Sequence, residues 1–160
     1  MNILVSACLL GVECRYDGTG KEMVGLKALM KEYHLIPVCP EVFGGLPTPR
    51  MPSEIQPNRR VQMKDGKDVT QQYEKGAREV LKLARLYDCR YAILKERSPS
   101  CGHEEIYDGS FTGRKIPGNG IASELLEKNG VKVFGESQIE LLKSRIEEEA
   151  YEYKHGRVTK

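Results

Sequence analysis

The sequence lacks several features that would assign it to a known functional class. It has no run of about 20 apolar residues, and its start shows no basic segment followed by an apolar one, so we expect a soluble, cytoplasmic protein. The glycine patterns of dinucleotide-binding folds and P-loops are absent, which leaves hydride and phosphoryl transfer without support. No linker or repeat divides the 160 residues. We therefore expect one domain over residues 1–153 and a frayed basic tail over residues 154–160.

The chain also lacks a strong charge of either sign and any close cysteine pair. Its 25 Lys and Arg residues against 23 Asp and Glu residues leave a net charge of +2, which predicts no general attraction to nucleic acid or membranes. The sequence has five cysteines, and none forms a C-x-x-C pair of the kind that holds structural zinc. An odd number of thiols without an export signal favours metal or catalytic roles over disulfides.

Apolar runs alternate with helical periods along the chain, as in α/β domains. Four short apolar runs are typical of parallel strands covered on both faces: residues 2–7, 35–38, 91–94 and 131–134. Apolar positions at helical spacing predict four helices: residues 23–34, 70–87, 120–130 and 137–150. The Asp65-Gly66 turn signal predicts a small hairpin within residues 60–70, and residues 106–113 predict a turn or a second short hairpin. The order predicts a small, Rossmann-like, doubly wound domain with about four parallel strands.

Three cysteines follow three of these predicted strands. Cys8 comes after the first strand, Cys39 after the second, and Cys101 lies in the Ser-Pro-Ser-Cys-Gly loop after the third. Ligands bind in the crevice outside the carboxyl ends of parallel strands, so the three thiols should converge on one site. Cys89 precedes its strand and should lie at the opposite end of the sheet, as a small apolar side chain of the core. Cys14 is a weak candidate, because no strand end fixes it.

Three converging thiols favour a metal site of one of two kinds. An iron-sulfur cubane held by three thiolates would leave one iron open to a substrate or water. Zinc with three protein ligands and a water is the other possibility. The spacing of the cysteines does not choose between them.

Polar residues close to the thiols in the sequence could take part in chemistry. Glu41 could align or deprotonate water, the hydroxyl of Ser98 or Ser100 could relay a proton, and Lys95 could stabilise negative charge. Each also has an ordinary structural interpretation, as a loop cap, a turn residue or a solvated charge. Arg50 and Asp17 are more ambiguous still.

Four sequence motifs resemble those of a known family. They are Ser6-Ala-Cys-Leu-Leu-Gly11 with Arg15-Tyr-Asp-Gly18, Pro37-Val-Cys-Pro-Glu41 with Gly44-Gly-Leu-Pro-Thr-Pro-Arg50, Ser98-Pro-Ser-Cys-Gly102, and Tyr107-Asp-Gly-Ser-Phe-Thr-Gly113. In this order they resemble the thiouracil desulfidase (TudS-like) family, and the resemblance runs over residues 2–136.

This resemblance implies a 4Fe-4S cluster with three cysteine ligands, Cys8, Cys39 and Cys101. It also implies a non-redox reaction that cleaves a C–S bond, in which the open iron takes the sulfur of a thiolated pyrimidine. Water assisted by Glu41 then replaces the sulfur, and sulfide stays on the open iron. Ser98 would assist, although Ser100 lies in the same motif, and Lys95 could hold the substrate. The expected partners are a small thiolated pyrimidine and sulfide, and we expect a monomer or a weak homodimer.

Three other functions remain open on the sequence alone. A desulfidase acting on thiouridine in RNA would use the same chemistry, although the balanced charge predicts no surface that tracks phosphates. A non-enzymatic iron-sulfur sensor or sulfide carrier would use the open iron to bind a ligand. The third is a binding domain that holds zinc or no metal.

Overall fold

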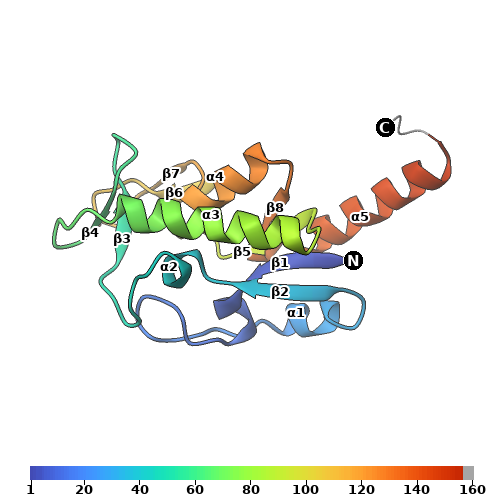
Figure 1. Cartoon of the computed structure of the whole chain (residues 1–160), viewed down its shortest axis with the longest axis horizontal. Helices are drawn as coiled ribbons and strands as arrows, with labels where there is room; N and C mark the ends of the chain where they lie inside the picture. Colours follow the sequence, from blue (N-terminus) through green and yellow to red (C-terminus); the bar gives the residue numbers. More distant parts are fainter. Residues whose placement is uncertain (157–160) are drawn as a thin grey trace.

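The computed structural model describes residues 1–156, which fold around a parallel sheet of four strands (Figure 1). The strand order is β2-β1-β5-β8, where the strands are β1 (Asn2–Ser6), β2 (His34–Val38), β5 (Tyr91–Leu94) and β8 (Lys132–Gly135). All neighbouring pairs are parallel, and β1 lies inside the sheet. The prediction of a doubly wound α/β fold with about four parallel strands is confirmed.

Each face of the sheet is covered by helices, because residues on both faces of the strands are apolar. Ile3 and Val5 point to the side covered by α1 (Val24–Leu29) and α5 (Ile139–Lys154). Leu4 points to the other side, where α3 (Thr70–Leu86) and α4 (Ile121–Lys128) pack. Alternate residues of a strand face opposite sides, so a strand buried on both faces must be apolar throughout.

Shorter elements lie at the carboxyl end of the sheet. They are η1 (Ala7–Leu10), α2 (Pro40–Phe43), the hairpin of β3 (Ser53–Ile55) and β4 (Val61–Met63), the hairpin of β6 (Glu105–Tyr107) and β7 (Lys115–Pro117), and η2 (Glu136–Gln138). In Figure 1 the two hairpins lie at one end of the molecule, and the N-terminus and α5 lie toward the other. The buried side chains of the two hairpins form a third apolar cluster with the start of α3.

The hairpin predicted within residues 60–70 is confirmed. The chain turns at Asp65-Gly66, where the Met63 N–H donates to the Lys67 carbonyl, the Val69 N–H donates to the Val61 carbonyl, and Gln62 pairs antiparallel with Asp68. The sequence does not predict that β4 also pairs antiparallel with β3. The proline-rich segment after Cys39 begins with the short helix α2. Proline is well tolerated there because the first turn of a helix needs no N–H donor.

Two predicted helices begin or end elsewhere. The first ends at Leu29, since His34 already belongs to β2. The last begins at Ile139 rather than at residue 137, because the hydroxyl and N–H of Ser137 both donate to Glu96 and Ser137 lies in η2. Helix α5 continues to Lys154, where the frayed tail was expected to begin, and residues 157–160 lie outside the described part of the chain. Within residues 1–156, no helix is both long and apolar enough to cross a membrane.

The topology determines where a site can form. After β1 the chain moves to one side of the sheet to form β2, and then to the other side for β5 and β8. The strand order therefore reverses at the boundary between β1 and β5. In open α/β sheets, a crevice forms at the carboxyl ends of the strands next to such a reversal.

Candidate active site

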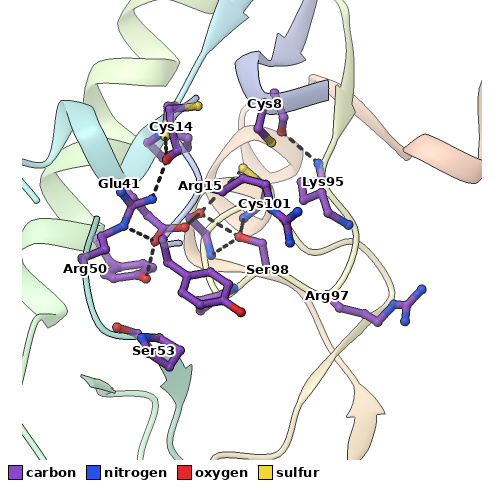
Figure 2. Close-up of a pocket in the computed structure, with 18 of the residues that line it drawn as sticks. Cys8, Cys14, Arg15, Glu41, Arg50, Ser53, Lys95, Arg97, Ser98 and Cys101 are labelled. Atoms are coloured by element: carbon purple, nitrogen blue, oxygen red, sulfur yellow. Dashed lines mark hydrogen bonds and ion pairs between the residues drawn. The ribbon is translucent and has the colours of Figure 1, made fainter. Parts of the chain in front are cut away.

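A cavity of about 470 Å³ lies at this reversal, in the range typical of small-molecule sites. Its floor is formed by the segments that follow β1, β2 and β5, and its outer wall by residues of the two hairpin regions, such as Ser53 and Phe111. Figure 2 shows Cys8, Glu41, Ser98 and Cys101 directed into one space, with Ser98 and Cys101 on one loop and the other two on separate segments. Distant parts of the sequence therefore meet here.

Four of the five thiols line this cavity. Cys8 lies on η1, Cys39 is the N-cap of α2, and Cys101 lies in the loop after β5, as the strand-end argument predicts. Cys14 also lines the cavity, is buried, and accepts a hydrogen bond at its carbonyl oxygen from the Cys39 thiol at 3.8 Å. Cys89 packs in the core under α3 and takes no part in the cavity.

The loop that carries Cys101 is held by its own serine and by α4. The Ser98 hydroxyl accepts hydrogen bonds from the N–H groups of Ser100 (3.2 Å) and Cys101 (3.1 Å). The first N–H groups of α4 donate to the carbonyls of Pro99 and Ser100, so the start of the helix ties down the loop. A Cβ at Gly120 would lie 2.5 Å from the Ser100 backbone, which explains why glycine opens this helix.

Glu41 lies at the centre of a hydrogen-bond network. Its Oε1 atom accepts from the Tyr73 hydroxyl at 2.8 Å and from Nε of Arg50 at 3.1 Å. Its Oε2 atom accepts from the Ser100 hydroxyl at 2.8 Å. Ser100 is in turn 2.9 Å from the hydroxyl of Ser98, so a continuous chain of oxygens runs from Glu41 to Ser98.

Arg50 connects this carboxylate with the first loop. Its side chain is only 2% exposed, and its Nη2 atom donates to the Cys14 carbonyl at 2.8 Å. Nη1 donates to the Pro47 carbonyl and the Thr48 hydroxyl. Since a buried guanidinium is costly without partners, these contacts fix both the arginine and Glu41. Arg50, ambiguous in the sequence, therefore belongs to the site.

Tyr73 reaches Glu41 because α2 packs directly on α3. The contact is so close that a Cβ at Gly76 would lie 1.8 Å from the carbonyl oxygen of Pro40. Tyr73 lies on the buried face of α3 and is 1% exposed. Its hydroxyl contact was missed, because periodicity predicts burial but says nothing of the polar end of the side chain.

Lys95 lines the cavity, but its ammonium group already has a partner. Nζ lies 2.6 Å from Glu136, and the Lys95 N–H donates to the Ser6 hydroxyl at 2.8 Å. A contact between Lys95 and a ligand must therefore compete with this ion pair. Arg97 lines the same cavity but points away from the thiols in Figure 2.

The Tyr-Asp-Gly motifs divide between turns and cavity wall. Asp17 accepts hydrogen bonds from the N–H and hydroxyl of Thr19, and Asp108 accepts the same pair from Ser110, so both aspartates form turns. The preceding Tyr16 and Tyr107 line the cavity instead. Their aromatic rings offer flat apolar surface, which suits a planar ligand.

A family model and a solved structure point to the same family. Residues 3–138 match the family model described as 2-thiouracil desulfurase. The uncharacterized protein YbbK of Bacillus subtilis (strain 168) is 39% identical over 146 residues, which cover 86% of this chain and 97% of that protein. The structure of a [4Fe-4S]-dependent thiouracil desulfidase, TudS, superposes with a TM-score of 0.87 at 44% identity, covering 91% of this chain and 97% of that one.

Proposed function

Because the chain belongs to the 2-thiouracil desulfurase family, we propose that it removes sulfur from thiolated pyrimidines of the 2-thiouracil type with the help of a 4Fe-4S cluster. The observation that carries the proposal is the meeting of three strand-end thiols, Cys8, Cys39 and Cys101, with the carboxylate of Glu41 in one cavity. The similarity to TudS, 44% identical, supports the same assignment. We propose that residues 1–153 form the single domain that does this.

The chemistry of the donors fits such a cluster. Iron-sulfur clusters are held by thiolates, and the cavity offers Cys8, Cys39 and Cys101 from three separate segments. Burial raises the pKa of Cys101 to about 12, and a hydrogen bond with Cys14 together with burial raises the pKa of Cys39. Protonated thiols at these depths lose their protons when a cation binds, so the positive charge of iron suits the site.

The bound group would supply the chemistry that the chain itself lacks. Within residues 1–156, no group of three His, Cys, Asp or Glu side chains is found that could hold a single metal ion. When bound by three thiolates, a cubane supplies an iron without a protein ligand, a Lewis acid that can polarise the thiocarbonyl and accept the sulfide.

The residues of the chain then perform a hydrolysis without redox change. Glu41 aligns and deprotonates a water, which adds to the carbon of the C=S group while the C–S bond breaks. Thiocarbonyl and water thus become carbonyl and hydrogen sulfide, with no electrons gained or lost. One proton of the water goes first to Oε2 of Glu41, the oxygen that accepts the hydrogen bond from Ser100, and the other leaves the added hydroxyl as the C–S bond breaks. Both protons end on the released sulfur, which returns Glu41 to its carboxylate form.

Ser98 and Ser100 take different parts in this proposal. Ser100 is 1% exposed and lies between Glu41 and Ser98, so it can link them but cannot present its hydroxyl to a bulky ligand. Ser98 is half-buried and lines the cavity, so it can donate to the ring or to the departing sulfur. Lys95, paired with Glu136, would contribute to holding the substrate.

The test is turnover by protein loaded with its cluster under anaerobic conditions. We expect 2-thiouracil to give uracil and sulfide in equal amounts. A protein that holds iron and sulfide but converts neither 2-thiouracil nor thiolated RNA would instead be a sensor or carrier, and conversion of thiolated RNA alone would move the substrate from small molecules to RNA.

A further inference from the structure

We propose that Tyr73 and Arg50 are positioning residues, which hold the carboxylate of Glu41 so that its Oε2 atom alone is free to act on water. The inference rests on the proposed function, because it gives Glu41 a part in that reaction. Neither Tyr73 nor Arg50 needs to touch the substrate, since both act through the carboxylate. Both residues reach the same oxygen, Oε1, from different parts of the chain.

The two carboxylate oxygens of Glu41 differ in how many hydrogen bonds they accept, and this difference separates their roles. A carboxylate oxygen offers about two acceptor sites. Oε1 has both filled, one by the Tyr73 hydroxyl and one by Nε of Arg50. Oε2 receives one hydrogen bond within the described part of the chain, from Ser100, which leaves one acceptor site for a ligand or water in the cavity. The same carboxylate therefore has one anchored oxygen and one working oxygen.

Arg50 makes this orientation difficult to change. Its guanidinium is held by the Pro47 and Cys14 carbonyls and the Thr48 hydroxyl, so it cannot follow Glu41 if the carboxylate turns away. A turned Glu41 would leave a guanidinium 2% exposed without its counter-charge. Breaking one partner of a buried ion pair is strongly unfavourable, which favours a single orientation.

Tyr73 makes the orientation specific. It stands on the 17-residue helix α3, and the packing of Gly76 against Pro40 sets the distance between that helix and Glu41. Burial, together with the nearby Glu41 carboxylate, keeps the pKa of Tyr73 well above its ordinary value, so the phenol remains a proton donor. Because this donor fixes Oε1, Oε2 stays directed toward the Ser100 hydroxyl, which in turn contacts the Ser98 hydroxyl.

The first variant to measure is Tyr73→Phe, which removes only the hydroxyl. We expect kcat to fall by roughly 10- to 100-fold, as for a small misplacement of a catalytic group, with KM and iron content unchanged. The matched control is Tyr91→Phe, because Tyr91 is also buried and donates to a glutamate, Glu149, at 2.5 Å far from the cavity. Both variants should lower the melting temperature to a similar degree, but the control should keep its kcat.

A double-mutant cycle with Glu41→Gln tests whether Tyr73 acts through the carboxylate. If it does, Tyr73→Phe should cause no further loss in the Glu41→Gln background, where the slow residual turnover is followed over hours. An equal loss in both backgrounds would overturn the inference. So would a wild-type kcat in Tyr73→Phe, or a rise in KM with unchanged kcat.

Arg50 is tested with Arg50→Lys, which keeps the charge but loses the forked donor geometry. We expect kcat to fall in this variant with iron content retained, since one ammonium cannot reproduce the four contacts. A lysine that restored full kcat would show that only charge is needed, and would remove Arg50 from the inference.

Crystal structures of the wild type and Tyr73→Phe distinguish failure of this inference from failure of the proposed function. A wild-type Glu41 held by both donors in a protein that turns over no thiolated pyrimidine contradicts the proposed function but keeps the anchored orientation. A Glu41 that faces away from Tyr73 in an active enzyme overturns the inference and leaves the function standing. In Tyr73→Phe we expect the carboxylate to rotate about its ion pair with Arg50, which this variant keeps.

Discussion

The two ends of the parallel sheet carry the same set of side chains in different surroundings. At each end a buried tyrosine donates to a glutamate that also pairs with a cation. At the carboxyl end the three are Tyr73, Glu41 and Arg50, and at the amino end they are Tyr91, Glu149 and Lys132. Each end also has a buried cysteine close to strand β5, Cys101 at one and Cys89 at the other.

What differs is the depth of the charges. The side chains of Glu41 and Arg50 are 14% and 2% exposed, whereas those of Glu149 and Lys132 are 31% and 50% exposed. Charges in contact with water are screened and contribute little, while buried charges act strongly on whatever they face. Residue type alone therefore does not make a site. Burial beside a cavity does, so a matched change at the amino end is the control for a change at the carboxyl end.

The largest effect is expected from the cysteines. Cys101→Ala should abolish both the cluster and the activity, because a cubane would keep only two protein ligands. Cys89→Ala should keep both and cost roughly 1 kcal/mol of unfolding free energy, as a small change in a packed core. The measurement is the iron content and turnover of the two variants under the same conditions. Loss of iron in the Cys89 variant would mean that the two ends are not functionally distinct.

Glu41→Gln is expected to have the next largest effect. It should keep the iron and lower kcat by about 10²- to 10⁴-fold, the range for loss of a general base. Glu149→Gln should leave kcat unchanged, since Glu149 faces Lys132 and Tyr91 at the far end. Steady-state measurements of kcat for both variants test this difference. A fully active Glu41 variant would remove this carboxylate from the mechanism.

A smaller effect is expected from two glycine-to-alanine substitutions, one at each end of the sheet, because the added Cβ atoms would meet different surroundings. Gly76→Ala would place a Cβ against the Pro40 carbonyl, so it should cost about 1–3 kcal/mol and lower kcat by displacing α2 and Glu41. Gly130, at the amino end, has φ +83° and open space around its Cβ position. Gly130→Ala should cost about 1 kcal/mol and leave kcat alone. Denaturant unfolding with activity assays measures both, and equal kcat in the two variants would contradict the α2 argument.

The smallest effect concerns the pH dependence of stability at the amino end. Burial raises the pKa of Glu149, but hydrogen bonds from Lys132 and Tyr91 outweigh it and hold the pKa below its ordinary value. Such a group stabilises the fold above its unfolded pKa and loses that contribution as the pH falls through its folded pKa. The stability gap between wild type and Glu149→Gln should therefore shrink as the pH falls below the ordinary glutamate pKa of about 4.3. A constant gap would exclude this linkage.

The sequence predicts the strands and the convergence of thiols because these depend on local patterns. The buried run before Cys101 and the Ser-Pro break after it are both visible in the order of residues, as is the run before Cys39. Parallel strands bring their carboxyl ends to one edge, so the position of Cys8, Cys39 and Cys101 in one cavity follows from topology. Cys89 could be excluded from the cavity for the same reason.

The anchoring of Glu41 could not be predicted in this way. Helix α2 has four residues, too few for a helical period, and its packing on α3 depends on the contact of Gly76 with Pro40. The hydroxyl of Tyr73 meets Glu41 only once these helices touch. The β3–β4 pairing was missed for a related reason, since the Asp65-Gly66 turn signal is local while the register depends on which segments meet in space.

The central claim is that the thiols at the carboxyl end of the sheet hold an iron-sulfur cluster. It is tested most directly by the iron, acid-labile sulfide and zinc content per chain in protein purified without oxygen. We predict about four irons and about four sulfides per chain, with no stoichiometric zinc. Stoichiometric zinc, or no metal even after anaerobic reconstitution, would contradict the account and leave the buried thiols of this cavity to another role.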